Sequence, residues 1–274
     1  MITEVLINGE PSDGRIPVTD SSVLRGDGCF EVMRAYEGKS FALEGHLDRL
    51  ERSAAALMID LPDRVELVSW IEKTAAALGD GAVRVVVTRG SSVPGRADPP
   101  NTIVFGHSLP PIAGPVRLLP VVAPWHSADV AWDLAGAKTI SYAPNMAAVR
   151  RAQEFGFEDA LLVTPDGIVL EGPTFSVAWV VDGVLETPSL DLGILDSITR
   201  RVALEAASDA GLTILEGVWV LDRLHDASEV MAWSTIREVQ SVTAVGERVW
   251  PLGPVTGILA NTFQKLTSWG TKPH

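Results

Sequence analysis

The sequence predicts a two-domain protein of the α+β or α/β class. Strand-like and helix-like segments alternate through the first 110 residues, and a second series of both follows residue 116. Between them, the run Pro110-Pro-Ile-Ala-Gly-Pro115 breaks any regular element. At 274 residues the chain is long enough for two moderate domains. We therefore expect a small N-terminal domain at 1–110, a linker at 111–116 and a larger domain at 117–274.

The N-terminal part combines short strands with two amphipathic helices. Apolar and polar residues alternate in 29–36, which places Glu31 with Cys29 and Met33 on one face and Arg34 with Phe30 on the other. Leucines at helical spacing indicate the helices. The expected elements are strands at 4–9, 29–36, 82–88 and 102–105, helices at 43–57 and 65–78, and a loop at 90–101.

The second part predicts hairpins and three helices. Pro165-Asp-Gly167 and Asp182-Gly183 are typical of tight turns. Asp196 or Ser197 is the expected cap of a helix that stops at Gly211. The expected elements are helices at 146–155, 196–210 and 256–269, a strand at 230–233, and hairpins at 160–170 and 242–251.

Composition excludes several classes of protein. Hydrophobic residues make up 46% of the chain, yet no apolar run reaches the ~20 residues of a membrane-spanning helix. Cys29 is the only cysteine, so neither an intrachain disulfide nor a cysteine-built zinc site is expected. The formal charge of −13 argues against nucleic-acid binding, which depends on basic surfaces. A cytoplasmic protein without a signal peptide or a metal site is the expectation.

Lys138 is the most informative single residue. The chain has only five lysines, and this one lies in the largely apolar run Leu134–Met146, with no acidic residue between Asp133 and Glu154. A lysine in an apolar site loses part of its preference for the ammonium form and becomes a usable nucleophile. The alternative is a lysine whose ammonium group reaches solvent at a strand edge.

Other residues could serve a phosphorylated aldehyde bound to such a lysine. Glu171 follows the strand-like segment 168–170 and could keep a pyridine nitrogen protonated. Arg49 offers a planar two-pronged donor to a phosphate. The helix that begins near Ile198 and Thr199 offers free N–H groups, and Ser234-Thr235 adds two hydroxyls. Taken singly, each of these residues also fits an ordinary structural role.

Together these motifs resemble the fold-type IV pyridoxal-phosphate enzymes, the class IV aminotransferase family. The resemblance covers residues 4 to 260 in order. The family includes branched-chain and D-amino-acid aminotransferases, (R)-amine transaminases and aminodeoxychorismate lyases. The motifs that carry it are Arg25-Gly-Asp-Gly-Cys-Phe-Glu31, His46-Leu-Asp-Arg49-Leu, Lys138, Leu170-Glu171-Gly172, Ile198-Thr199 and Ser234-Thr235.

The resemblance implies a fold and a cofactor. The fold would be that of D-amino-acid aminotransferase, with a small α/β domain and a larger β-barrel-like domain with helices. Lys138 would form a Schiff base with pyridoxal 5′-phosphate and carry the proton, and Glu171 would pair with the pyridine nitrogen. The remaining cofactor contacts would come from Arg49, Tyr142, Ile198, Thr199, Ser234 and Thr235. Tyr142 matches the family pattern only with a one-residue gap.

The chain departs from the family pattern at three places near these motifs. Ser176 stands where members usually carry asparagine, Trp233-Ser-Thr235 replaces the usual Thr-Gly-Thr turn, and Ser241 stands where a proline is expected. None of these changes removes a catalytic group. They leave the details of cofactor binding open.

The resemblance leaves two reactions open. An aminotransferase would move an amino group from a D-amino acid, a branched-chain amino acid or an (R)-amine to a 2-oxo acid. A lyase would form 4-aminobenzoate and pyruvate from aminodeoxychorismate. We favour the aminotransferase because Gly28-Cys-Phe-Glu31 resembles the aminotransferase version of the motif. The stretch 137–146 favours the other reaction, since it resembles actinobacterial chains called lyases. A pyridoxal-phosphate-binding protein without catalysis is a remote alternative.

Substrate contacts are the weakest part of the pattern. Candidates to bind the substrate are Glu31, Arg34 and Tyr36 on the early strand and Arg96 in the loop at 90–101. His107 and His126 could line the pocket but equally fit a structural role. The family resemblance also implies a homodimer.

Overall fold

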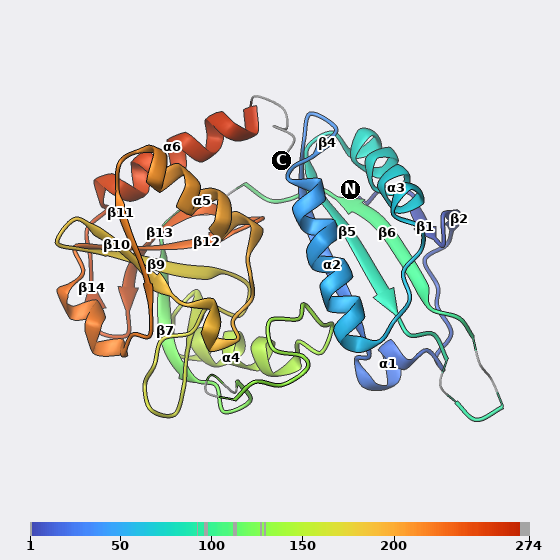
Figure 1. Ribbon diagram of the computed structural model, residues 1–274, viewed down its shortest axis with the longest axis horizontal. Helices are drawn as coiled ribbons and strands as arrows, with labels where there is room; N and C mark the ends of the chain where they lie inside the picture. The colour runs from blue at the N-terminus through green and yellow to red at the C-terminus, as the bar shows by residue number, and fades with distance from the viewer. Residues whose placement is uncertain are drawn as a thin grey trace. The chain divides into compact units, whose positions relative to one another are not determined.

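The computed structural model describes residues 2–91, 93–95, 98–111, 114–126, 128 and 130–268. The fold mixes helices with two β-sheets, as the sequence predicts (Figure 1). The chain divides into two compact units. The first comprises Met1–Pro111, Ala137–Tyr142 and Leu266–His274, and the second comprises Ile112–Gly136 and Ala143–Lys265. The six residues that contain Lys138 thus belong with the N-terminal part, and the domain boundaries drawn from the sequence stay a prediction.

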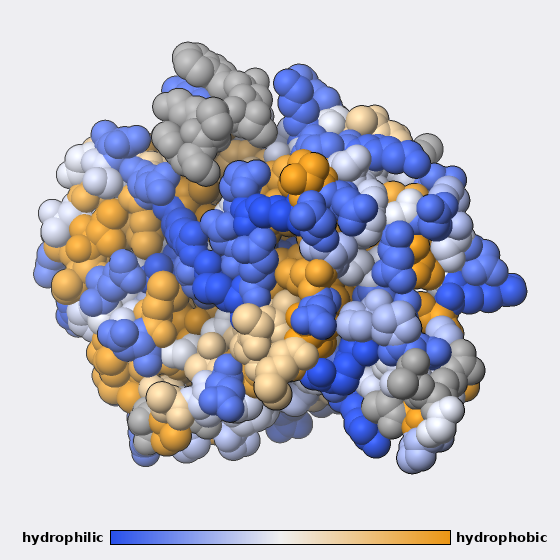
Figure 2. Space-filling view, turned by 45° about the vertical axis from the view of Figure 1, so that its right-hand side comes forward, coloured by the Kyte–Doolittle hydropathy of each residue, from blue (hydrophilic) through white to orange (hydrophobic). Residues whose placement is uncertain are grey.

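Hydrophilic side chains cover much of the face shown in Figure 2, with hydrophobic areas between them. Several large apolar side chains are exposed, among them Met58, Val65 and Phe155. The hydrophobic residues of the chain are therefore divided between buried clusters in each unit and the surface, which is normal for a folded protein. Among the described residues, no helix is long and apolar enough to cross a membrane.

The first unit is an antiparallel sheet of six strands in the order β2-β1-β6-β5-β3-β4. Its longest strand, β3, pairs with β5 along eight residues, from Gly28 opposite Thr88 to Ala35 opposite Gly81. The strands are β1 (Val5–Ile7), β2 (Glu10–Ser12), β3 (Gly28–Tyr36), β4 (Lys39–Ser40), β5 (Gly81–Thr88) and β6 (Asn101–His107).

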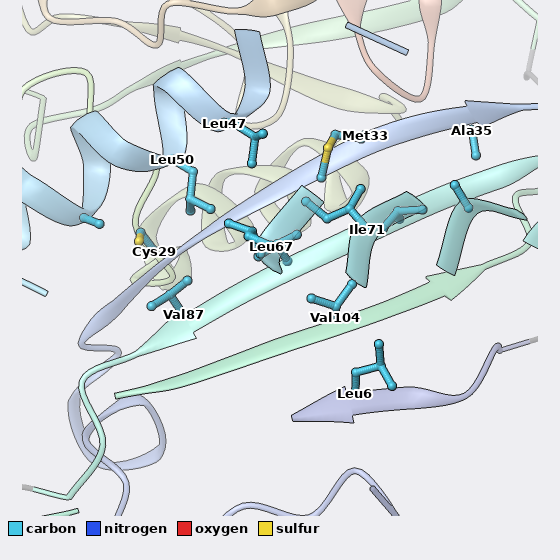
Figure 3. Close-up of a cluster of buried hydrophobic side chains, with 14 of the residues drawn as sticks. Leu6, Cys29, Met33, Ala35, Leu47, Leu50, Leu67, Ile71, Val87 and Val104 are labelled. Atoms are coloured by element: carbon cyan, nitrogen blue, oxygen red, sulfur yellow. The ribbon is translucent and has the colours of Figure 1, made fainter. Parts of the chain in front are cut away.

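Helices α2 (Leu43–Leu57) and α3 (Arg64–Leu78) pack on one face of this sheet. Figure 3 shows Leu47 and Leu50 of α2 and Ile71 of α3 directed toward Met33 of β3. Because side chains alternate along a strand, Cys29, Glu31 and Met33 lie on this buried face, as the sequence predicts. A third helix, α1 (Ser21–Arg25), was not expected from the sequence.

The second unit is built on an eight-stranded sheet in the order β11-β10-β9-β12-β13-β7-β8, with β14 paired to β13. Three of its pairings are parallel, namely β10 with β11, β13 with β7, and β7 with β8. The strands are β7 (Val116–Val122), β8 (Asp159–Val163), β9 (Ser176–Val181), β10 (Val184–Pro188), β11 (Thr213–Gly217), β12 (Glu229–Ser234), β13 (Glu238–Val245) and β14 (Arg248–Val249).

Isolated bridges join the two edges of this sheet into the expected barrel-like form. Val169 bridges to Val163 of β8, and Ile168 bridges to Val220, which lies shortly after β11. Trp179, Leu161 and Val230 belong to the core of this unit. The helices are α4 (Ala143–Glu154), α5 (Ile198–Asp209) and α6 (Pro254–Ser268), together with the 3-10 turns η1 (Leu190–Leu192) and η2 (Leu221–Asp226).

Local signals account for most boundaries. Ser197 caps α5 by accepting the N–H of Arg200, as expected. The first strand of the expected hairpin at 160–170 is β8, whereas residues 168–170 form only isolated bridges and no strand. Helix α6 begins two residues earlier than expected because Glu229, buried on β12, accepts the N–H groups of Val255 and Thr256. That contact joins residues far apart in the chain and leaves no local signal.

Ile71 provides a test of the first core. Its side chain has no exposed surface, so Ile71→Ala is expected to lower the free energy of unfolding by about 2 to 5 kcal/mol. Val65 on the same helix is 76% exposed, so Val65→Ala should change it by no more than about 0.5 kcal/mol. Urea unfolding of both variants measures the two values, and similar losses in both would contradict the packing described.

Candidate active site

Lys138 lies in a short extended segment held against the beginning of β3. Its carbonyl accepts the N–H of Phe30 at 3.0 Å, and the N–H of Ile140 donates to the carbonyl of Gly28 at 2.9 Å. Between them, Thr139 forms a bridge with Cys29. The backbone of Lys138 is therefore fixed as if it were one more strand of the first sheet.

The ammonium group of Lys138 lies among aromatic groups. Its Nζ is 4.4 Å from the centre of the Phe30 ring and donates to Tyr142 Oη at 3.4 Å. The rings of Phe30 and Tyr142 meet edge to face, with centres 5.3 Å apart. Lys138 is partly buried and in contact with two aromatic residues, whose ring faces attract a cation. Its role as a reactive amine stays a prediction.

Helix α2 supplies a second anchor to this segment. Ser53, which is 1% exposed, accepts the backbone N–H of Lys138 at 3.0 Å. Arg49 and His46 lie on the same buried side of α2, four and seven residues before Ser53. One side of an otherwise leucine-rich helix thus carries three polar groups, and each of them is hydrogen-bonded.

Glu31 is the common partner of His46 and Arg49. Its carboxylate accepts two hydrogen bonds from the Arg49 guanidinium, from Nε and from Nη2, both at 2.7 Å. His46 Nδ1 lies 2.8 Å from Glu31 Oε2 and donates there, because a carboxylate only accepts. All three side chains are at most 5% exposed. They form a buried ionic cluster, which we call the Glu31 cluster.

The Glu31 cluster shifts two pKa values downward. Burial alone would raise the pKa of Glu31, but the charge and hydrogen bonds of Arg49 and the hydrogen bond of His46 outweigh it and hold that pKa well below its usual range. Burial lowers the pKa of His46, and the charges of Arg49 and Lys138 add to this against the attraction of Glu31. At neutral pH the cluster therefore consists of a carboxylate, a guanidinium and a neutral imidazole.

The candidate substrate residues of β3 fall on opposite faces. Glu31 has no exposed surface, so in this structure its carboxylate serves Arg49. Arg34 and Tyr36 lie on the face opposite to Glu31 and are partly buried, with the guanidinium 5.2 Å from the centre of the Tyr36 ring. Phe30 shares this face four residues earlier, about 13 Å along the strand. Arg96 lies outside the described residues.

In the second unit, Glu171 follows the bridge residues 168–169, as expected. Its carboxylate accepts the backbone N–H of Leu195 at 3.3 and 3.2 Å, and His126 Nε2 lies 3.8 Å away. Glu171 is 15% exposed, which leaves part of the carboxylate accessible. His126 is thus near a candidate site residue, and Leu195 is a contact that no sequence signal indicated.

The beginning of α5 offers unpaired donors. The hydrogen bond from Leu195 to Glu171 places the segment just before α5 next to Glu171, which lies in the loop before β9. Ser197 caps the N–H of Arg200, whereas the backbone N–H groups of Ile198 and Thr199 donate to no group in the part of the chain that the structure describes. Two adjacent free N–H groups at a helix N-terminus favour an anion such as a phosphate.

Ser234 ends β12 and Thr235 begins the turn after it, and both are partly buried. The Ser234 hydroxyl accepts the N–H of Arg237 at 3.1 Å. Two of the residues that depart from the family pattern, Ser176 and Trp233, are direct cross-strand partners on β9 and β12. The small serine side chain therefore lies beside the large tryptophan side chain. Within the described residues, Ser176 Oγ and Trp233 Nε1 are both covered by protein and have no partner.

Glu31→Gln tests the electrostatics of the cluster. Removing the carboxylate leaves the Arg49 charge buried, so the free energy of unfolding at pH 7 should fall by about 3 to 5 kcal/mol. The stabilisation by a carboxylate with a depressed pKa is complete above the unfolded value near 4.5 and is lost as the pH falls below it. The difference between wild type and variant should therefore shrink below pH 4.5.

A matched control is Glu44→Gln, which removes a carboxylate that is 57% exposed and pairs with Arg64. An exposed pair contributes about 0 to 1 kcal/mol. Urea unfolding over a pH series measures both variants. A loss for Glu31→Gln as small as that of the control would refute the role given to the cluster.

Comparisons with known proteins agree with this arrangement. The family model described as "Amino-transferase class IV" matches residues 28–245. The chain is 30% identical to the putative branched-chain-amino-acid aminotransferase of Methanocaldococcus jannaschii, with 99% of each chain covered. It is also 30% identical to the aminodeoxychorismate lyase of Bacillus subtilis, covering 89% of this chain and 87% of the relative.

A solved structure shares the fold. A hypothetical aminotransferase from Mycobacterium tuberculosis in its PLP-bound form superposes with a TM-score of 0.87 and 27% identity, over 97% of this chain and 98% of that one. The family match runs from Gly28 to Val245, and the two relatives cover 99% and 89% of this chain. This chain is therefore a member of the class IV aminotransferase family and has the fold-type IV architecture.

Proposed function

We propose that this protein is a pyridoxal-phosphate-dependent aminotransferase in which Lys138 is the catalytic amine. The setting of Lys138 carries the proposal. Its backbone is fixed to β3 and α2, and its Nζ is held between Phe30 and Tyr142, beside no carboxylate on its own segment. A fixed amine in a largely apolar setting suits reversible attack on an aldehyde.

The residues of each unit fit the cofactor separately. In the second unit, the free N–H groups of Ile198 and Thr199 suit its phosphate, with hydroxyls from Thr199, Ser234 and Thr235 as further donors. Glu171 retains an accessible carboxylate for the pyridine nitrogen. In the first unit, Lys138 and Tyr142 suit the aldehyde and the neighbouring phenolic oxygen. Arg49, held by Glu31, would add a charged donor to the phosphate.

The chemistry divides between cofactor and protein. When bound, pyridoxal phosphate supplies an aldehyde that takes up the amino group and a protonated ring that draws electrons from the adjoining carbon. Glu171 would keep the ring nitrogen protonated. Lys138 Nζ would remove the proton from the substrate Cα and deliver it to the cofactor carbon. Tyr142 would hold Nζ in place between these two positions.

We further propose that the amino donor is a D-amino acid, a branched-chain amino acid or an (R)-amine, and that a 2-oxo acid is the acceptor. The similarity to an aminotransferase over 99% of the chain supports this choice. The similarity to a lyase at the same identity keeps 4-aminobenzoate formation as the second candidate. Both reactions require the same lysine and the same electron sink, so these residues do not decide between them.

The family resemblance supports a homodimer, and the single cysteine of the chain fits a location in the cytoplasm. Sedimentation velocity tests the first point and cell fractionation the second. A homodimer would have about twice the mass of the 29.3 kDa chain. A monomer at micromolar concentration would refute this part of the proposal.

Lys138→Ala tests the catalytic amine. Wild-type protein supplied with pyridoxal phosphate should gain the visible absorbance band of the lysine-bound cofactor, and Lys138→Ala should lack it. Lys73 lies on α3 with 62% of its side chain exposed, so Lys73→Ala should leave the band unchanged. Absorption spectra after removal of excess cofactor make the comparison. A band that persists in Lys138→Ala would overturn the assignment.

The reaction is tested with a panel of amino donors. D-alanine, L-leucine, (R)-1-phenylethylamine and aminodeoxychorismate are each mixed with the cofactor-loaded enzyme, and the change of the cofactor spectrum is followed. An aminotransferase converts the cofactor to its aminated form with one of the first three and forms the matching oxo product. Formation of 4-aminobenzoate and pyruvate would instead establish the lyase, and no conversion with any donor would support a non-catalytic binding protein.

A further inference from the structure

We infer that Ser53 is a positioning residue for Lys138, an inference that rests on the proposed function of that lysine. Ser53 accepts the Lys138 backbone N–H at 3.0 Å and is 1% exposed. It belongs to none of the motifs that carry the family resemblance. Its role follows from the contacts that hold residues 137–142, which we call the lysine segment.

The lysine segment has few supports of its own. Residues 137–142 belong to no helix or strand, and within them the N–H of Lys138 is satisfied by a side chain. The carbonyl of Lys138 and the N–H of Ile140 are bound by the backbone of β3. These two contacts hold the segment to β3, and the Ser141 hydroxyl donates to the carbonyl of Gly26 at 2.8 Å, just before that strand. The Ser53 hydroxyl adds a contact from another element, α2, and we infer that it fixes the orientation of the segment about β3.

Serine at this place on α2 is otherwise unfavourable. The next three residues, 54–56, are alanines, which have the highest helix propensity, whereas a serine inside a helix is less favourable. A buried hydroxyl also needs a partner. The contact with the Lys138 N–H supplies that partner and explains a polar residue among the alanines.

The same helix positions the Glu31 cluster. Arg49 and Ser53 are four residues apart, slightly more than one helical turn, so their Cα atoms are separated by about 6 Å along the helix axis. Glu31 fixes Arg49 from β3, and Phe30 of the same strand fixes the carbonyl of Lys138. The spacing between the lysine backbone and the Arg49 guanidinium is therefore set by one turn of α2 and one strand. Ser53 is the contact through which the helix sets it.

Loss of the hydroxyl should misplace the amine without removing it. A buried N–H without an acceptor is costly enough that the segment is expected to move toward water or another acceptor. Displacement of a catalytic group by about 1 Å can cost a factor of 100 in rate. The effect should fall on kcat more than on KM, because Lys138 moves protons after the substrate has bound.

The decisive comparison is Ser53→Thr with Ser53→Val. The two side chains have nearly the same shape, and only threonine keeps the oxygen. Ser53→Thr should retain kcat within about 3-fold, whereas Ser53→Val should lose a factor of about 10 to 100 with KM changed by less than about 3-fold. Ser40→Ala serves as the control, because that hydroxyl is 2% exposed and has no partner among the described residues. It should leave kcat unchanged.

A second measurement uses the protein without cofactor. Amide hydrogen exchange of a peptide that spans Lys138 should be slow in wild type, Ser53→Thr and Ser40→Ala, and faster in Ser53→Val. Equal kcat and equal exchange for the threonine and valine variants would overturn the inference. A variant that fails to fold, recognised by its melting curve, would be replaced by Ser53→Ala in the same comparison.

The two proposals fail in different ways. If Lys138→Ala keeps the visible band, the proposed function is wrong whatever the Ser53 variants do. If Lys138→Ala loses the band while Ser53→Val matches Ser53→Thr, the function stands and the positioning role of Ser53 is refuted.

Discussion

The candidate site residues of the first unit depend on one buried charge, the carboxylate of Glu31. A carboxylate without exposed surface is stable only if its partners replace the lost hydration. Arg49 does so with two hydrogen bonds and His46 with a third. These partners lie on α2 and the carboxylate on β3, so the helix cannot slide along the strand without breaking the cluster. The ionic contact thereby fixes the frame to which Lys138 is attached.

Close backbone approach is the second requirement of that frame. A Cβ atom at Gly28 would lie 2.3 Å from the Val87 carbonyl oxygen and 3.0 Å from Ile140 Cδ1. Only glycine therefore allows β5 and the lysine segment to meet β3 on its two sides. The hydrogen bond from Ile140 to the Gly28 carbonyl requires this approach. Glycine, the Glu31 cluster and Ser53 together determine where the Lys138 amine lies.

The sequence predicted the chemical groups better than their partners. Lys138 was identified by an apolar run free of acids, and in the structure its Nζ lies beside Phe30 and Tyr142, while its role as the catalytic amine stays a proposal. The alternation along 29–36 had already placed Glu31 on the face of Cys29 and Met33, which forms the core. Its assignment as a substrate residue came from the family motif and conflicts with that alternation, so a supporting role fits its burial better.

Other contacts could not be predicted, for a physical reason. Ser53 and Lys138 are 85 residues apart, and Glu171 is 24 residues from Leu195. Periodicity and propensity describe neighbours within a few residues and contain no information on such pairs. The same holds for Ser176 and Trp233. They read as two separate departures in the sequence, and only the register of β9 and β12 shows that they are one cross-strand pair.

The choice between the two reactions must come from groups that bind the substrate carboxylates. With a formal charge of −13, the protein as a whole repels an anionic substrate, so arginines must attract it locally. Arg34 and Arg84 lie at diagonal positions on the face of the first sheet opposite to Glu31, because Val32 pairs with Arg84, and both are partly buried. The only acid of β3, β5 and β6 is Glu31, which points to the other face and is neutralised by Arg49. Burying Glu31 therefore does more than hold the lysine, because it also leaves the face that carries these two arginines without an acid from its own strands.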